Sequence, residues 1–459
     1  MTYFFETYGC EMNIAESASV EQLLISRGWT KADDAQLSDL IIINTCSVRA
    51  TAETRIYGRL GFYTGLKKLR NCEPGAKSRN MEIAAEYVEK NGAVPITIVV
   101  MGCMAERLLK TLQQEWPCVD YVVGTYAKSK FGDIITAVEN HEKPVQVDEE
   151  PVYTFAATSY EEGAFSTFVP IMHGCNNFCT YCIVPYVRGR EVSRPAVQIL
   201  NEIDILSQRD VKEITLLGQN VNSYNDSDGT NFAGLLRLIS RHLDEIKSSI
   251  EWIRFESSNP KDFSDELIEL IAKDPHICHG LHIAVQHGST RILKAMNRRY
   301  TRESYLELVR KLKAFIPDLA LSTDIMLGFP GETDEDFEQV VSLMREVQYE
   351  SAFMYYYNPR EGTPAAKMDC QIDMEVKKER LQKIIDMQLE ITKNVMLRRI
   401  GQTVKVLADI ISRDNKEEIL GKTAQNERIA FKGSSSLIGK FVSVHIDSLN
   451  GNTFKGTLV

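Results

Sequence analysis

The sequence predicts an α/β protein in three parts: an amino-terminal parallel sheet with helices on both faces, a partial (β/α)6 barrel, and a small carboxy-terminal antiparallel β-barrel. Apolar runs alternate with helical patterns over residues 1–145 and, about six times, over residues 160–393. Such alternation is typical of parallel sheets covered by helices. Over residues 396–459, short alternating strands separated by Gly, Ser and Asn predict the small barrel.

In the first part, apolar runs end shortly before Cys10, Cys46 and Cys103. The runs occupy residues 2–7, 39–45, 96–101 and 119–124, and helical patterns follow them. Ligands of open parallel sheets bind beyond the carboxyl ends of the strands. We therefore expect these three thiols to converge on one site. The alternative is three separate core residues, because free cysteine is often buried.

The middle part repeats a strand–helix unit. Strands are expected near residues 168–172, 213–218, 252–257, 281–286, 321–327 and 353–357. The spacing between them suits βα units with a helix in each connection. A charged helix over residues 375–400 is expected to join this part to the last one.

A C-x3-C-x2-C run, Cys175, Cys179 and Cys182, follows the first of these strands. Thiolates suit iron–sulfur chemistry, and a four-iron cluster takes four ligands, so three cysteines leave one iron open. Structural zinc is the alternative, but no second C-x2-C pair lies nearby and His173 is only two residues from Cys175. A disulfide set within this run is disfavoured because three is an odd number of cysteines and because the sequence shows no secretory start.

Composition indicates a globular protein that does not cross a membrane. Hydrophobic residues make up 44% and charged residues 25% of the 459-residue chain, which has a formal net charge of −10. No apolar run reaches the roughly 20 residues that a bilayer requires. We expect a cytoplasmic protein whose ten cysteines serve as ligands more readily than as disulfides.

From Val376 to the end, Lys and Arg outnumber Asp and Glu, although the whole chain is acidic. A basic tail suggests an anionic partner such as nucleic acid, whereas an ordinary solvated surface is the alternative. Phe431 and Phe454 each precede a lysine, and a ring beside a cation suits stacking on a base. We favour the interpretation that both rings fill the core of the predicted barrel.

The stretches TYGCEMN, NTCSVR and MGCMAE, ahead of CNNFCTYC, resemble the methylthiotransferase branch of the radical S-adenosylmethionine (SAM) family over essentially the whole chain. GQNVNSY and GFPGET strengthen the likeness to the members that modify tRNA. The sibling that modifies a ribosomal protein usually carries LGCPKN, which this chain lacks. Glu11, Ala284 and His287 depart from the pattern that is usual in the tRNA-modifying members.

The resemblance implies a specific reaction. The substrate is tRNA with N6-isopentenyladenosine at position 37, and the product is its 2-methylthio derivative. Two [4Fe-4S] clusters and two molecules of SAM take part, with Cys175, Cys179 and Cys182 serving SAM cleavage and Cys10, Cys46 and Cys103 serving sulfur transfer. It also implies a monomer that receives electrons from flavodoxin or ferredoxin. The alternatives are threonylcarbamoyl-adenosine or a ribosomal protein as substrate, and a non-catalytic, metal-stabilised RNA-binding protein.

The resemblance further implies SAM contacts at the ends of the barrel strands. These are Tyr181, Gly218, Gln219, Gln286, His287, Thr323, Asp324, Asn358 and Pro359. For each of them, turn or strand-end structure is the alternative. Arg188 and Arg194 suit the SAM carboxylate or an RNA phosphate, and a surface salt bridge is as good an explanation. Gly328 fits a tight turn better than a ligand contact.

Overall fold

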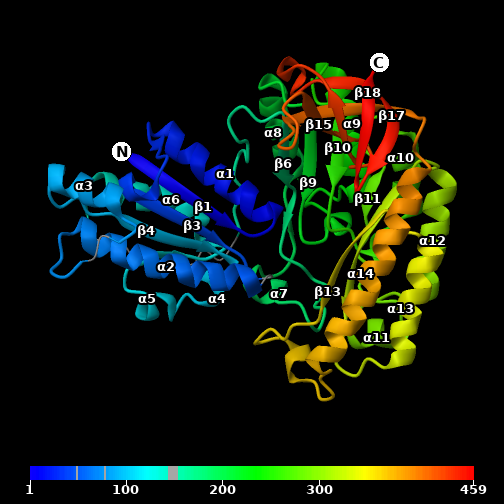
Figure 1. Cartoon of the computed structure of the whole chain (residues 1–459), viewed down its shortest axis with the longest axis horizontal. Helices are drawn as coiled ribbons and strands as arrows, with labels where there is room; N and C mark the ends of the chain where they lie inside the picture. The colour runs from blue at the N-terminus through cyan, green and yellow to red at the C-terminus, as the bar shows by residue number, and fades with distance from the viewer. Residues whose placement is uncertain (48–49, 77–78, 143–152) are drawn as a thin grey trace. The chain divides into compact units, whose positions relative to one another are not determined.

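The computed structural model describes residues 1–47, 50–76, 79–142 and 153–459, which form two compact units (Figure 1). The first unit comprises Met1–Asn176 and Ile183–Arg194, and the second comprises Asn177–Cys182 and Pro195–Val459. Two residues of the NTCSVR stretch, at positions 48 and 49, and the predicted boundary at residue 145 lie outside the described residues. Within these ranges, no helix has both the length and the apolar character that crossing a bilayer requires.

The first unit contains a five-stranded sheet in the order β2-β1-β3-β4-β5, with every neighbouring pair parallel. The strands are β1 (Thr2–Tyr8), β2 (Thr30–Lys31), β3 (Leu40–Thr45), β4 (Thr97–Gly102) and β5 (Tyr121–Val123). Four of them are the predicted apolar runs. The two-residue strand β2 is too short to carry a sequence pattern.

Helices cover both faces of this sheet, because its strands are apolar on both sides. The helices are α1 (Glu11–Ser26), α2 (Ala50–Arg70), α3 (Glu82–Asn91), α4 (Cys103–Arg107), α5 (Leu112–Glu115) and α6 (Phe131–Glu139). Successive side chains of a strand point to opposite faces. Ile41 and Ile43 of β3 accordingly share a core with α2 and α3, whereas Leu40 and Ile42 share one with α1 and α6. Figure 1 shows α1 and α2 on opposite sides of the sheet.

All six predicted barrel strands form. They are β6 (Ser166–Pro170), β9 (Glu213–Leu217), β10 (Trp252–Phe255), β11 (Gly280–His282), β12 (Ala320–Leu327) and β13 (Ser351–Tyr356). In the second unit, β9 pairs with β10 and β12 pairs with both β11 and β13, always in parallel. The short elements β7 (Met172–His173), β8 (Val192–Ser193) and α7 (Val184–Val187) surround the cysteine loop in the sequence.

Helices connect these strands, and several begin at side chains that cap them. The helices are α8 (Ala196–Gln208), α9 (Phe232–Ile246), α10 (Asp265–Lys273), α11 (Thr290–Ala295), α12 (Arg302–Phe315), α13 (Asp334–Val347) and α14 (Met374–Leu397). Asn231 caps α9, and Thr301 and Thr333 form capping boxes at α12 and α13. Caps of this kind satisfy backbone N–H groups that the first turn leaves without partners. Figure 1 shows α12, α13 and α14 packed outside β13.

The carboxy-terminal strands close into a barrel in the order β14-β15-β16-β18-β17. They are β14 (Thr403–Ile411), β15 (Glu418–Thr423), β16 (Arg428–Lys432), β17 (Phe441–Asn450) and β18 (Thr453–Leu458). All pairs are antiparallel except β16 with β18, which is parallel. Phe431 and Phe454 are 1% and 0% exposed in the barrel core. The core interpretation is therefore confirmed, and stacking of these rings on RNA is wrong.

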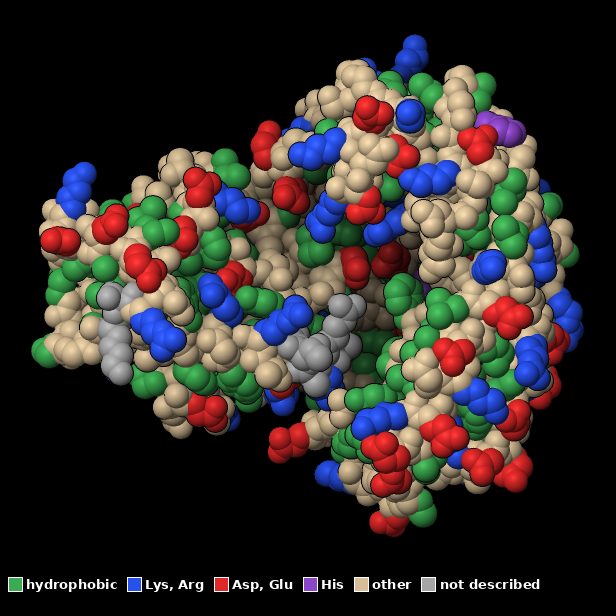
Figure 2. Space-filling view, viewed as in Figure 1, with side chains coloured by type: hydrophobic (Ala, Val, Ile, Leu, Met, Phe, Trp, Pro, Cys, Tyr) green, Lys and Arg blue, Asp and Glu red, His purple; other side chains and the backbone are tan. Residues whose placement is uncertain are grey.

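The barrel is anchored to the rest of the second unit through buried charges. Arg254 on β10 donates to the carbonyl oxygens of Thr423 and Ala424 and pairs with Glu213, which also pairs with Lys422 of the barrel. Other barrel lysines pair with carboxylates as well. On the face shown in Figure 2, acidic and basic side chains are mixed within each unit. Some of the basic side chains that give this part its positive charge are therefore paired with carboxylates of the same protein.

Candidate functional site

Three cysteines meet at the carboxyl edge of the first sheet. Cys10 and Cys46 lie just beyond β1 and β3, and Cys103 is the first residue of α4 directly after β4. Because these strands are neighbours in the sheet, their carboxyl ends lie side by side. The Cys46 thiol hydrogen-bonds to Cys10, and Cys103 is close enough to Cys10 for their charges to interact. The structure thus brings together thiols that are distant in the sequence.

A pair of buried asparagines holds the loops of this site. Asn13 donates to Asn44 Oδ1 at 2.9 Å and accepts from the Cys10 backbone N–H at 3.2 Å. Asn44 in turn donates to the Asn13 carbonyl oxygen at 2.9 Å. Gly102 has φ +94°, and a Cβ there would lie 2.5 Å from Asn44 Oδ1. The turn before Cys103 therefore requires glycine.

A charged cluster lies beneath the three thiols. Arg188 Nε donates to Cys103 Sγ at 3.1 Å, and its other nitrogens reach Glu16 at 2.7 and 3.3 Å. Lys128 also pairs with Glu16. Burial would raise the pKa of Glu16, but Arg188 and Lys128 hold it at about 2. The carboxylate is therefore ionised throughout the physiological range.

The same environment favours thiolates at one cysteine more than at another. The hydrogen bond from Cys46, aided by Arg188 and opposed by burial, lowers the pKa of the Cys10 thiol to about 6. Burial raises the pKa of Cys103 despite the neighbouring Arg188. A thiolate beside a guanidinium is a good ligand for a metal centre.

The donor set fits an iron–sulfur cluster. Within the described ranges, no group of three or more His, Cys, Asp or Glu side chains is placed so that it could hold a single metal ion. A cubane differs from a single ion, because each thiolate binds a different iron and the sulfurs need not converge on one point. Three neighbouring thiols with a buried cation as counter-charge meet that requirement.

The second cysteine set is divided between the units. Cys175 belongs to the first unit, and Cys179 and Cys182 belong to the second. In the second unit, Asn297 donates to the carbonyl oxygens of Asn177 and Phe178 at 3.2 and 2.9 Å. These bonds fix the backbone of the loop ahead of Cys179.

A buried arginine also reaches this loop. Arg298 Nη1 donates to Cys179 Sγ at 3.3 Å. Its Nε donates to Tyr300 and its Nη2 to the Ala284 carbonyl oxygen, both at 2.8 Å. Tyr181 lies between the two cysteines of the loop and packs against the core of Ile292, Met296 and Phe329, and burial raises its pKa well above the usual range.

Gly218 and Gln219 directly follow β9, as predicted. The Oε1 atom of Gln219 is buried and has no hydrogen-bond partner. Such an acceptor is costly unless a ligand satisfies it. This oxygen suits a donor such as the amino group of SAM.

The other predicted SAM contacts divide into two groups. Both ring nitrogens of His287 are engaged, with Ser289 N–H and with Glu332, and Thr323 Oγ1 bonds Ile283 and Val285. The polar side-chain atoms of both residues therefore already have partners within the protein. Asp324 remains partly exposed, and Gln286 donates to it at 3.3 Å.

The last predicted contacts, Asn358 and Pro359, follow β13 and are exposed. Gly328 has φ +66°, and its N–H donates to Glu332 at 2.7 Å. The tight-turn interpretation of Gly328 is therefore confirmed.

Arg188 and Arg194 are not surface residues. Each is 2% exposed, and Arg194 donates to the carbonyl oxygens of Pro170 and Ala156. The surface salt-bridge interpretation is wrong for both. Sequence reasoning also missed Glu16, Asn13 and Arg298, although Asn13 stands in the TYGC-x-MN stretch and Arg298 in the basic pair of NRRY.

The remaining four cysteines lie outside the two candidate ligand sets. Cys118 and Cys278 are buried, and burial raises the pKa of Cys278 to about 12. Cys72 and Cys370 are exposed. None of them joins either trio.

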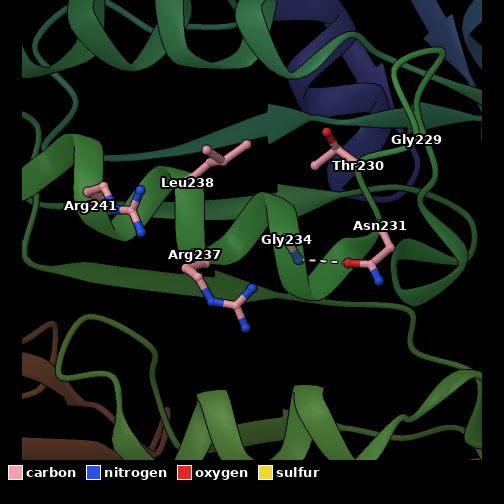
Figure 3. Close-up of a pocket in the computed structure, with 7 residues that line it drawn as sticks. All are labelled: Gly229, Thr230, Asn231, Gly234, Arg237, Leu238 and Arg241. Atoms are coloured by element: carbon pink, nitrogen blue, oxygen red, sulfur yellow. Dashed lines mark hydrogen bonds between the residues drawn. The ribbon is translucent and has the colours of Figure 1, made fainter.

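A surface hollow lies at the start of α9, away from these cysteines in the sequence (Figure 3). Its lining includes Thr230, Asn231, Arg237 and Arg241, and the Asn231 side chain is used in capping Gly234 N–H. Arg237 pairs with Glu266 at 2.8 Å. The hollow has no cysteine in its lining and is not part of the candidate site.

Three family descriptions match successive parts of the chain. Residues 2–124 match "Uncharacterized protein family UPF0004", residues 169–344 match "Radical SAM superfamily", and residues 397–459 match "TRAM domain". The first match contains Cys10, Cys46 and Cys103, and the second contains Cys175, Cys179 and Cys182.

Relatives match over all or most of their length. A protein of Treponema pallidum named tRNA-2-methylthio-N(6)-dimethylallyladenosine synthase is 51% identical over 100% of this chain and 99% of its own. Proteins of the same name from Treponema denticola and Acetivibrio thermocellus are 48% and 40% identical, covering 100% of this chain and 100% and 91% of their own. The chain belongs to the MiaB family of radical SAM methylthiotransferases.

Solved structures share the fold of this family member at low sequence identity. The radical S-adenosylmethionine methyltransferase TsrM from Kitasatospora setae, with cobalamin and a [4Fe-4S] cluster bound, has a TM-score of 0.56 at 14% identity over 80% of this chain and 77% of its own. The cobalamin-dependent radical enzyme OxsB has a TM-score of 0.51 at 12% identity over 86% and 56%. These likenesses concern the fold alone.

Proposed function

We propose that this chain converts N6-isopentenyladenosine at position 37 of tRNA to its 2-methylthio derivative. The observation that carries the proposal is the 51% identity to a synthase named for this product, over essentially the whole of both chains. The six predicted ligand cysteines all lie inside the matched families. A C–H bond on an aromatic ring is too strong for side-chain acid–base chemistry, which is why a radical cofactor suits the reaction.

Each cysteine trio has a role in the proposal. Cys175, Cys179 and Cys182 would hold one [4Fe-4S] cluster, and Cys10, Cys46 and Cys103 would hold the other. When bound, the first cluster supplies the electron that cleaves SAM and the second carries the sulfur. Burial of Cys46, Cys103, Cys175 and Cys179 keeps water from these centres.

Other side chains bind and orient the reactants. The buried Oε1 of Gln219 is the proposed acceptor for the SAM amino group. Gly218, Gln286, Asp324, Asn358 and Pro359 are proposed contacts around the same ligand, as is the backbone at Tyr181. Arg298 orients Cys179 through its N–H···S bond, as outer-shell donors do at other metal sites.

The partners follow from the same proposal. The residues that match the TRAM domain would contact the anticodon stem-loop. A flavodoxin or ferredoxin would supply electrons, and the chain would act as a monomer in the cytoplasm.

The test is a reconstituted assay with an isopentenylated anticodon stem-loop RNA, SAM and a reductant under anaerobic conditions. We expect about eight irons per chain, corresponding to two four-iron cubanes, and a methylthio product detected by mass spectrometry of the nucleosides. Methylthiolation of threonylcarbamoyl-adenosine or of a ribosomal protein, with no change in this RNA, would contradict the proposal. Colourless protein that holds only zinc would instead indicate a non-catalytic RNA-binding protein.

A further inference from the structure

Arg188 links the sulfur site of the first unit to a buried carboxylate. Its Nε lies 3.1 Å from Cys103 Sγ, and its Nη1 and Nη2 lie 2.7 and 3.3 Å from the two oxygens of Glu16. The Arg188 and Glu16 side chains are each 3% exposed. A bidentate ion pair of this kind fixes the orientation of the guanidinium, so that its Nε points at the sulfur.

The backbone that carries Arg188 is fixed as well. Tyr126 donates its hydroxyl to the Arg188 carbonyl oxygen at 2.9 Å, and Thr125 donates to the Val187 carbonyl oxygen at 2.8 Å. Both partners lie just after β5, in the same sheet that positions Cys103. The same sheet therefore positions both Arg188 and the Cys103 thiol.

The charges of the buried cluster do not cancel without the thiols. Arg188 and Lys128 are cations, and Glu16 is the one carboxylate that pairs with them in the described part of the chain. His173 Nδ1 faces Arg188 Nη1 at 3.4 Å, so that ring nitrogen is an acceptor and the imidazole is neutral. One positive charge is therefore in excess in a buried place, which is costly unless an anion neutralises it.

Three thiolates around a cubane core of charge 2+ carry a net charge of −1, which matches this excess. We propose that Arg188 is a positioning residue for the sulfur-carrying cluster at Cys10, Cys46 and Cys103. It holds the Cys103 thiolate in its ligating orientation and raises the reduction potential of that cluster. The inference rests on the proposed function, because it requires a cluster at Cys10, Cys46 and Cys103. Hydrogen bonds to ligand sulfurs and nearby positive charge both favour the more negative, reduced state of a cluster.

The test measures the midpoint potential of this cluster in isolation. The full chain carrying Cys175→Ala, Cys179→Ala and Cys182→Ala serves as the parent, and its cluster is titrated by EPR. Arg188→Gln removes both the charge and the N–H···S bond. We expect at least a tenfold loss of the reduced form at fixed potential, which is a shift of about 59 mV to more negative values for one electron.

Two further variants separate this role from general stability. Arg188→Lys keeps the charge, so we expect a smaller shift in the same direction. Arg70→Gln is the matched control, because Arg70 is 0% exposed in the same unit and donates to the Val94, Gln36 and Ser38 carbonyl oxygens. It should leave the potential unchanged.

An unchanged potential in loaded Arg188→Gln, or an equal shift in Arg70→Gln, would overturn the inference. If Arg188→Gln takes up no iron, the shift in Arg188→Lys decides in the same way. If neither loads, circular dichroism of the apo-proteins decides, since a native spectrum supports a role at the thiols and an unfolded chain contradicts it. A parent chain that binds no cluster would refute the proposed function itself.

Discussion

The two sets of candidate ligand cysteines differ in how far apart their members lie in the sequence and in what positions them. Cys10, Cys46 and Cys103 are separated by whole strand–helix units and meet because β1, β3 and β4 are neighbours in one sheet. Cys179 and Cys182 lie in one short loop whose backbone is held by Asn297. The first arrangement depends on the fold, whereas the second depends chiefly on local spacing.

Both sites contain a buried arginine next to a thiol, but the two arginines have different partners for their positive charge. A buried arginine donates to a thiol in each, Arg188 to Cys103 and Arg298 to Cys179. Arg188 is tied to Glu16, whereas the partners of Arg298 are the Tyr300 hydroxyl and the Ala284 carbonyl oxygen. The partners of Arg298 other than the Cys179 thiol are therefore neutral groups, whereas Arg188 has a carboxylate partner.

The largest expected effect separates the two sites by reaction. Cys179→Ala should abolish both SAM cleavage and methylthiolation, because it removes a ligand of the cluster proposed to cleave SAM. Cys10→Ala should abolish methylthiolation but retain some SAM cleavage. Quantifying 5′-deoxyadenosine and the modified nucleoside in one assay checks both, with exposed Cys72→Ala as the control. Equal SAM cleavage in the two ligand variants would contradict the division of roles.

A smaller effect is expected from the arginine of the second unit. Arg298→Gln removes the N–H···S bond to Cys179, and losses of outer-shell donors typically cost about 10–100-fold in metal affinity or activity. We expect SAM cleavage to fall by about that factor, with partial recovery in Arg298→Lys. Iron content and cleavage rate measured together test this, and a wild-type cleavage rate in Arg298→Gln would show that the bond is incidental.

The fold-dependent site should also be sensitive to the residue that joins its loops. Asn13→Ala removes the bonds to Asn44 and to the Cys10 backbone, leaving buried polar groups unsatisfied. We expect a loss of about 1–3 kcal/mol in the free energy of unfolding of the apo-protein. Urea denaturation measures it, and Asn91→Ala, at an exposed helix end, should have little effect. Similar losses in both variants would mean that the Asn13–Asn44 pair adds nothing.

The smallest effect concerns a contrast between a buried carboxyl group, Glu16, and a half-buried one, Glu350. Glu16 of the first unit is ionised, but burial and the neighbouring Glu427 raise the pKa of Glu350 in the second unit to about 8. The folded protein keeps this proton between the ordinary pKa of Glu and about pH 8, while the unfolded chain loses it. Stability therefore falls as pH rises through this window and levels off above it.

The measurement compares melting temperatures at pH 6 and pH 9. We expect the second unit to melt a few degrees lower at pH 9, and Glu350→Gln to reduce this difference because it carries no proton to lose. An equal pH dependence in Glu350→Gln and the wild type would assign the effect to another group.

Much of the architecture was predictable because its signals are local. The apolar runs of β1, β3 and β4, the six strands of the partial barrel and the helix α14 all carry periodic patterns in the sequence. Strand β15 carries a weaker pattern, because Gly421 interrupts it, and a Cβ there would lie 2.4 Å from Val406 Cγ1. The barrel was predicted to be antiparallel, but β16 pairs with β18 in parallel, since pairing between distant strands leaves no local trace in the sequence.

By itself, the sequence determined which cysteines are candidate ligands, because the spacing of a motif and the position of a residue after a strand are properties of the chain. Only the tertiary structure decided what surrounds them. Glu16, Lys128 and Arg188 are far apart in the sequence, and nothing in their local patterns distinguishes them from surface charges. They become one buried cluster because desolvated charges must pair, and the sheet brings them within reach of each other.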